Sequence, residues 1–281
     1  MILLKLISEQ YTKKEIYANE MTSGHITCYN SLSQIIHSYS FYETTILRFG
    51  GNIEMRLIFI RHPESTKNTN GHFSSYENTE PLTTLGWTQV NSIKSEIQTL
   101  LDNGFVKKPI SLYSATSMRS ITLAKELASI CGSEINEQVC LNSINSGTVT
   151  GLNKEQMDKV APGYFHEIEL YESGISNAYT IKHQGESPTC FEKKVSLLLK
   201  KIETSVTDTA IIIAHKSALT AIFINYARRK NYYPQDFYGY IPFDTASFSI
   251  VDIDNGDINI IGVNKSVEEF DSLQKKYDYN K

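Results

Sequence analysis

The sequence predicts a doubly wound α/β protein, a three-layer α/β/α sandwich around a mostly parallel sheet. Short, uniformly apolar segments such as 56–60 and 209–214 have the composition of strands that are buried on both faces. Segments with helical spacing, such as 84–101, separate them. Two further apolar segments, 248–253 and 258–263, flank an Asp-Asn-Gly turn and predict a closing β-hairpin. Alternation of this kind is typical of α/β domains.

The expected elements begin at residue 56 and alternate along the chain. They are strand 56–60, helix 84–101, strand 110–113, helix 117–130, strand 209–214 and helix 217–229. Helix 84–101 places its apolar residues on one stripe, as a helix that packs on a sheet does. In sheets of this type ligands bind beyond the carboxyl ends of the parallel strands, so the residues that follow each strand are the candidates for function.

The chain divides into an extension, residues 1–54, and an α/β domain, residues 55–281. The extension is rich in Ser, Thr, Tyr and Ile and ends at Gly50-Gly51. Three roles stay open for it: an accessory helical segment, a partner-binding arm, or sequence upstream of a true start at Met55.

The composition excludes several classes of protein. The net charge of −4 does not predict a broad basic face for nucleic acid, and no apolar stretch approaches the ~20 residues of a membrane span. The four cysteines form no C-x-x-C pair and no cluster of metal ligands, which favours buried free thiols in a reducing compartment. We therefore expect a cytoplasmic protein without a bound metal or cofactor.

Cationic residues follow three of the predicted strands. Arg61 and His62 end the first strand, Arg119 comes shortly after the second, and His215 and Lys216 follow the third. Parallel strands would bring all five to one edge of the sheet, where cations repel one another unless an anion lies between them. A phosphate fits best, because guanidinium groups bind its oxygens in bidentate fashion.

Several motifs follow one another along the chain: RHPESTKN (61–68), PLTTLGWTQ (81–89), YSATSMRSITLA (113–124), LNSINSGTVTGLNK (141–154), GES (185–187) and IIIAHKSAL (211–219). In sequence and in order they resemble the motifs of the histidine phosphatases, the phosphoglycerate mutase-like superfamily, in its first branch. The resemblance covers roughly residues 56–252 and implies a phosphoglycerate mutase-like fold.

The resemblance implies a role for each residue at the strand ends. His62 would be the nucleophile and would carry a phosphohistidine intermediate, while Arg61, Arg119 and His215 would hold the phosphoryl oxygens. The attacking nitrogen of His62 must be neutral, so we expect its other ring nitrogen to donate to a backbone carbonyl. Pro63 replaces the glycine usual in the family, which removes an amide donor and favours an extended His62.

Four further positions are expected to support the site. By the resemblance, Asn68 and Ser74 match phosphate-contacting positions. Glu186 is expected to orient a cation. Lys216 either adds positive charge to the pocket or extends into solvent.

The general acid usual in the family is absent, because Ser143 stands where a glutamate is expected. A serine hydroxyl protonates an alkoxide poorly near neutral pH. Three explanations stay open, and in the first a carboxylate from segment 161–180 substitutes, with Glu167, Glu169 and Glu172 as candidates. Alternatively, the substrate has a good leaving group, as a phosphohistidine or an acyl phosphate does, or the protein binds phosphate without hydrolysing it.

These observations predict a metal-independent phosphohydrolase acting through phosphohistidine on a phosphorylated small molecule or phosphoprotein. One alternative is a phosphoglycerate mutase-type phosphotransferase, disfavoured because Ser143 and Ile144 stand where mutases place the acid and a neighbouring cation. The other is a catalytically impaired phospho-ligand-binding protein. The oligomeric state stays open, with a homodimer among the states considered.

Overall fold

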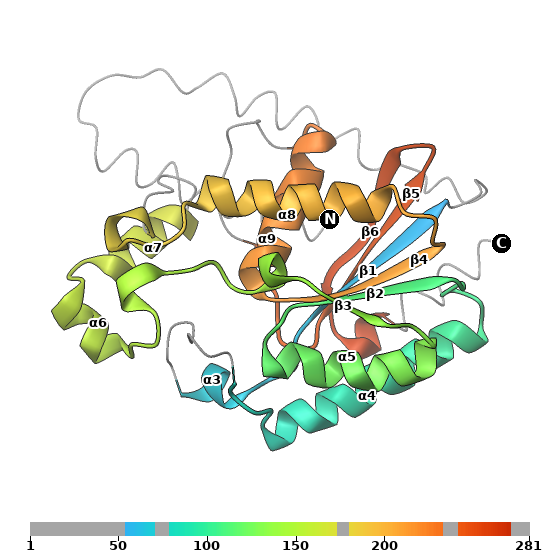
Figure 1. Ribbon diagram of the computed structural model, residues 1–281, viewed down its shortest axis with the longest axis horizontal. Helices are drawn as coiled ribbons and strands as arrows, with labels where there is room; N and C mark the ends of the chain where they lie inside the picture. Colours follow the sequence, from blue (N-terminus) through green and yellow to red (C-terminus); the bar gives the residue numbers. More distant parts are fainter. Residues whose placement is uncertain (1–53, 71–78, 173–179, 233–240, 271–281) are drawn as a thin grey trace.

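Six strands form one mixed sheet that is covered by helices on both faces (Figure 1). The computed structural model describes residues 54–70, 79–172, 180–232 and 241–270. The strand order is β3-β2-β4-β1-β5-β6. The expected three-layer α/β/α architecture with a mostly parallel sheet is therefore confirmed.

The strands fall into a parallel part and an antiparallel part. β1, β2, β3 and β4 run parallel to one another, whereas β5 pairs antiparallel with β1 and with β6. The bounds are β1 Met55–Arg61, β2 Ile110–Ser114, β3 Ile135–Glu137, β4 Thr209–Ala214, β5 Phe248–Asp254 and β6 Asp257–Lys265. The late strand β4 inserts between β1 and β2, so residues that follow these three strands meet at one edge.

Two hydrophobic clusters fix the layers, one on each face of the sheet. Side chains of β1 alternate between them: Ile58 and Ile60 face one cluster, and Leu57 and Phe59 face the other. The first cluster is completed by α4 (Thr84–Asp102) and α5 (Met118–Cys131), the second by α8 (Pro188–Glu203) and α9 (Lys216–Arg229). Burial on both faces explains why β1 and β4 are almost uniformly apolar.

The segment between β3 and α8 carries short helices. They are η1 Val139–Leu141, η2 Gly147–Val149, α6 Lys154–Val160, α7 Tyr164–Glu172 and η3 Ile181–His183. None of these, nor β3 and α8, was predicted from the sequence. The strands and helices expected from residue 56 onward are all present, and their bounds differ by at most two residues from those expected.

Several expectations fall outside the described residues. They concern the extension, of which only Glu54 is described, and Ser74. Of the cysteines that are described, all three are free thiols, but only Cys131 is buried; Cys140 is half-buried and Cys190 is exposed, so the expectation of buried thiols is wrong for Cys190. Within the same residues, no helix has the length and apolarity needed to cross a membrane.

Candidate active site

Two histidines meet at the carboxyl edge of the sheet because their strands are neighbours. His62 follows β1 and His215 follows β4, and the last residues of these strands, Arg61 and Ala214, are paired in register. The imidazole ring centroids lie 4.6 Å apart, and both side chains are buried. Arg119 lies in the first turn of α5, the helix that follows β2, and contacts both histidines.

His62 is held as a neutral imidazole with its Nε2 lone pair turned into the site. Its Nδ1 lies 2.8 Å from the carbonyl oxygen of Pro63, which accepts a hydrogen bond but cannot donate one. Nε2 in turn accepts from Nε of Arg119 at 3.3 Å. The expected backbone partner is therefore present, and the residue that replaces glycine supplies it.

Arg119 joins three groups through its three guanidinium nitrogens. Nε donates to His62, NH2 donates to Nδ1 of His215 at 3.1 Å, and NH1 donates to Oε2 of Glu80 at 3.0 Å. The side chain is fully buried. A guanidinium has five N–H donors, so these contacts orient it without engaging every donor.

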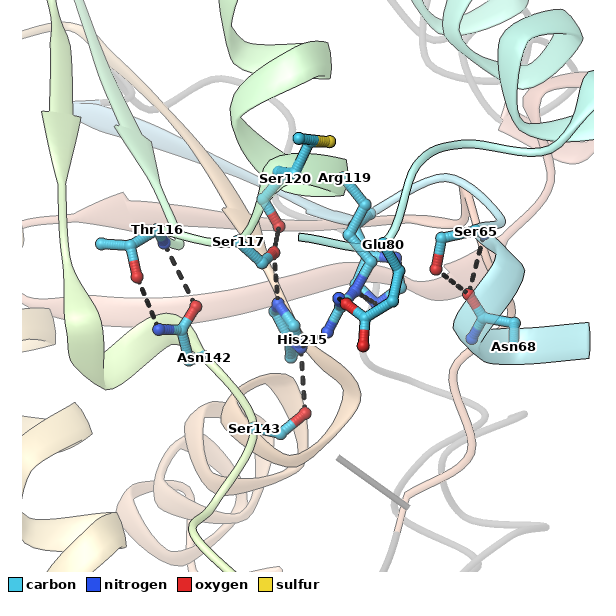
Figure 2. A network of polar contacts seen from close by, with 12 residues as sticks. Ser65, Asn68, Glu80, Thr116, Ser117, Arg119, Ser120, Asn142, Ser143 and His215 are labelled. Atoms are coloured by element: carbon cyan, nitrogen blue, oxygen red, sulfur yellow. Dashed lines mark hydrogen bonds and ion pairs between the residues drawn. The ribbon is translucent and has the colours of Figure 1, made fainter. Parts of the chain in front are cut away.

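His215 is fixed by serines on both sides (Figure 2). Nδ1 accepts from Arg119 and from the hydroxyl of Ser143, 2.9 Å away, so the proton belongs on Nε2. Nε2 lies 2.7 Å from Oγ of Ser117, which donates onward to Ser120 at 3.0 Å. The Arg119 guanidinium, which can only donate, thus sets the tautomer of His215, and the two hydroxyl groups complete its hydrogen bonds.

Arg61 enters the site from the end of β1. Its NH1 donates to the carbonyl of Phe243, whereas Nε is buried and has no hydrogen-bond partner among the described residues. Burial lowers the pKa of Arg61 to about 10, against the opposing effect of Asp244. A buried donor of this kind is expected to be paired when a ligand is bound.

Burial lowers the pKa of Arg61, Lys67, Arg119 and both histidines, and neighbouring positive charge adds to the effect at all of them except Arg61. Burial, together with the neighbouring Arg119 and Arg61, holds the pKa of His62 well below its usual range, and burial with His62 and Arg119 does the same for His215. Burial also lowers the pKa of Lys67, in α3 (Thr66–Thr69), to about 8, with Arg119 adding to the effect. Burial lowers that of Arg119 to about 10, although Glu80 opposes the change. Such a cluster is stabilised when an anion binds.

The loop that carries His62 is anchored by the second motif. Thr83 caps α4 and donates to Oε1 of Glu64 at 2.7 Å, and the Gln89 side chain accepts from the Glu64 amide at 2.8 Å. A Cβ on Gly86 would lie only 2.0 Å from the Glu64 carbonyl oxygen, so only glycine allows this approach. The second motif therefore positions the loop that carries His62.

The residues that were expected to support the site lie at different places relative to the histidine–arginine cluster. Asn68 is exposed, and its Oδ1 accepts from the amide and hydroxyl of Ser65, which leaves its amide nitrogen directed elsewhere (Figure 2). Lys216 opens α9 directly after His215. Glu186 forms an ion pair with Lys194 on the first half of α8. The cation that Glu186 orients is therefore on a helix outside the histidine–arginine cluster.

The carboxylate that reaches the cluster is Glu80, not one from segment 161–180. Of the three candidates in that segment, Glu167 pairs with Lys182 and Glu169 lies 3.6 Å from His166. The side chain of Glu172 is not among those that the structure describes. These residues belong to α7, which Figure 1 shows beside the beginning of α8 and away from α3. The expectation of an acid from this segment is wrong for Glu167 and Glu169.

Sequence reasoning missed Glu80, Lys67 and Ser117. Glu80 lies immediately before the second motif, and Lys67 lies inside the first motif but was not singled out. Ser117 lies inside the third motif but was not singled out. In the parts of the chain that the structure describes, no three His, Cys, Asp or Glu side chains come together in a way that could hold a metal ion.

Solved structures with the same fold are phosphatases and mutases. The mycobacterial glucosyl-3-phosphoglycerate phosphatase in complex with VO3 is 17% identical, with a TM-score of 0.58 over 75% of this chain and 100% of its own. The α-ribazole phosphatase from Shigella flexneri is 20% identical, with a TM-score of 0.56 over 75% of this chain and 96% of its own. The phosphoglycerate mutase from Bacillus anthracis is 16% identical, with a TM-score of 0.60 over 78% of this chain and 96% of its own. At these identities the likeness concerns the fold.

Sequence comparison gives the family. No curated protein matches the chain. The model of the histidine phosphatase superfamily, branch 1, matches residues 57–266, a span that begins within β1 and extends past the end of β6. Both site histidines and Arg119 lie inside this span. Together with the geometry of the site, this match supports a phosphatase-type function, and the chain belongs to branch 1 of the histidine phosphatase superfamily.

Proposed function

We propose that the protein is a phosphohydrolase that needs no metal and forms a phosphohistidine intermediate on His62. One observation carries the proposal: Nε2 of His62 is a buried lone pair directed at Arg119, with His215 4.6 Å away between ring centroids. A neutral imidazole among cations is a nucleophile next to a site for the charge of a phosphoryl group.

The first chemical step transfers the phosphoryl group to the protein. The Nε2 lone pair attacks phosphorus, the bond from phosphorus to the leaving-group oxygen breaks, and its electron pair stays on that oxygen. Arg119 donates to His62 Nε2 in the absence of substrate, so substrate binding must redirect this N–H to a phosphoryl oxygen. Arg61, Lys67 and His215 then surround the phosphoryl group as its charge shifts in the in-line transition state.

The second step returns the protein to its starting state. A water oxygen attacks phosphorus, the P–N bond breaks, and its electron pair returns to Nε2 of His62 as inorganic phosphate forms. The hydrogen bond from Nδ1 to the Pro63 carbonyl keeps the same ring nitrogen available in both steps. No step in this sequence calls for a metal ion.

Trapping the intermediate tests the proposal. The purified protein is mixed with acetyl phosphate in the presence of EDTA, quenched in base, and examined by intact-mass and peptide mass spectrometry. We expect one added phosphoryl group on His62, and none in His62→Ala. His166→Ala is the matched control because that histidine is exposed on α7. Hydrolysis that survives His62→Ala would contradict the proposal.

The same material separates the two alternatives. Isomerisation of a phosphorylated three-carbon acid, stimulated by a bisphosphate primer, would indicate a mutase. Sulfate or vanadate binding without any phosphoenzyme would indicate a phospho-ligand-binding protein. Phosphorylated small molecules are the expected substrates, and a phosphoprotein stays a further candidate.

A further inference from the structure

Glu80 is the carboxylate that the fold brings against the guanidinium of the site. Its Oε2 lies 3.0 Å from NH1 of Arg119, and the two side chains are 21% and 1% exposed. Glu80 immediately precedes the second motif, and 39 positions separate it from its partner in the sequence. The carboxyl group therefore lies at the boundary between the buried cluster and solvent.

The nucleophile and this carboxylate are placed around one guanidinium group. Arg119 contacts His62 through Nε and Glu80 through NH1, so the two side chains are separated by the width of the guanidinium (Figure 2 shows Glu80 against Arg119). In an in-line transfer the leaving oxygen lies on the side of phosphorus away from the attacking nitrogen. A phosphoryl group held by Arg119 in front of His62 directs that oxygen away from Nε2.

Substrate binding would bring a second anion next to the Glu80 carboxylate. The cations that face its carboxylate are Arg119 from α5 and Lys67 from α3, and Arg61 adds positive charge behind them. A phosphoryl dianion competes for the same cations. The two anions repel one another at this distance unless a proton lies between the carboxylate and a substrate oxygen, as in other pairs of neighbouring acids.

The carboxylates inside the motifs, Glu64 and Glu186, are held by partners outside the histidine–arginine cluster. Oε1 of Glu64 accepts from the Thr83 hydroxyl, and Glu186 is paired with Lys194. These two side chains are therefore engaged in anchoring the nucleophile loop and α8.

Asp244 and Ser143 also act on the histidine–arginine cluster. Asp244 raises the pKa of Arg61 through its charge, but its Oδ2 accepts a hydrogen bond from Asn264. The Ser143 hydroxyl, at the position where the family resemblance predicts an acid, donates to His215. Among the hydrogen bonds of the described residues, the one from Arg119 to Glu80 is therefore the link between a carboxyl group and the cations of the site.

We infer that Glu80 is the general acid that protonates the leaving group, in place of the acid missing at position 143. As the P–O bond breaks, its electron pair forms an O–H bond to the proton of the Glu80 carboxyl, and the alcohol leaves while Glu80 becomes a carboxylate. In the second step this carboxylate takes a proton from the attacking water and is ready again. The assignment rests on the proposed function, since it has meaning only if His62 is the nucleophile.

A series of leaving groups distinguishes a proton donor from a side chain that only positions Arg119. Steady-state kinetics of the full chain are measured with ethyl phosphate, phenyl phosphate and acetyl phosphate, which leave as increasingly weak bases. We expect Glu80→Gln to lower kcat for ethyl phosphate by a factor on the order of 10²–10⁴, and for acetyl phosphate by less than about tenfold. Glu80→Asp, which keeps a carboxyl group, is expected to retain part of the ethyl phosphate activity.

The controls separate failure of this assignment from failure of the proposed function. Glu167→Gln, a matched change at a carboxylate paired with Lys182, should leave all three rates unchanged. Equal losses on all three substrates in Glu80→Gln, with the melting temperature unchanged, would show positioning only and overturn the assignment. So would a wild-type protein that forms phosphohistidine but hydrolyses only acetyl phosphate. A wild-type protein that forms no phosphohistidine on any substrate overturns the proposed function itself.

Discussion

The hydroxyl of Ser143 lies 2.9 Å from Nδ1 of His215, at the position where the family resemblance predicts a carboxylate. The loop that carries Ser143 is tied to the start of α5 by Asn142, which accepts from the Thr116 amide at 3.1 Å and donates to the Thr116 hydroxyl at 2.7 Å. Ser143 therefore orients the second histidine, and its short side chain replaces an acid with a hydrogen-bond donor.

Ser143→Ala should lower kcat/KM only modestly. Loss of one neutral hydrogen bond is worth about 1 kcal/mol, which corresponds to about a fivefold loss. Arg119 and Ser117 still hold both nitrogens of His215. The measurement is kcat/KM for acetyl phosphate, with Ser129→Ala on the exposed face of α5 as the control. A loss as large as that in His62→Ala would mean that Ser143 takes part in the chemistry.

Lys67 should make anion binding depend on pH near 8. Burial and Arg119 lower the pKa of Lys67 to about 8, so the ligand-free protein loses this positive charge as the pH rises through that value. Sulfate keeps its charge over this range, and its dissociation constant should therefore increase from pH 7 to pH 9. Isothermal titration calorimetry measures the change. Lys67→Gln should bind sulfate more weakly at pH 7, and its dissociation constant should change little between pH 7 and pH 9. If the variant keeps the pH dependence of the wild type, Lys67 is not its source.

The two buried histidines should make the protein less stable below about pH 6.5, their ordinary pKa. The folded state holds the pKa of His62 and His215 well below that value, so the unfolded chain takes up protons that the folded chain does not. Stability therefore falls as the pH falls, by about 1.4 kcal/mol per pH unit for each neutral histidine. Urea unfolding between pH 5 and pH 7.5 measures the slope. His62→Gln should reduce the slope of unfolding free energy against pH by the contribution of one histidine. A slope identical to that of the wild type would contradict this assignment.

Gly86→Ala should both destabilise the protein and displace the loop that carries His62 and Glu64. The added Cβ would lie 2.0 Å from the carbonyl oxygen of Glu64 and 3.2 Å from Cβ of Leu82, so backbone must move. Overpacking of this kind costs about 1–3 kcal/mol. Thermal unfolding and kcat for acetyl phosphate are the measurements, with Ser92→Ala on the exposed face of α4 as the control. Full stability and activity would show that the loop adjusts freely.

Local signals predicted the elements that surround the site. β1, β2, β4 and the hairpin of β5 and β6 are apolar or alternating runs bounded by turn residues, and α4, α5 and α9 have periodic apolar stripes. The helices of segment 141–187 lack a clear stripe, because they are short and cover an edge of the core rather than a whole face. Their burial depends on contacts with distant residues such as Phe191 and Leu219.

The framework could be predicted from the sequence, because three apolar strands are each followed by a cation or a histidine in an order that indicates one shared edge. Tertiary structure alone decided which carboxylate joins that edge. Glu80 and Arg119 are far apart in the chain, and no local pattern records that the residue before the second motif reaches the first turn of α5. Long-range packing sets such a contact, because the direction of a polar side chain depends on which cation the fold brings within hydrogen-bond distance.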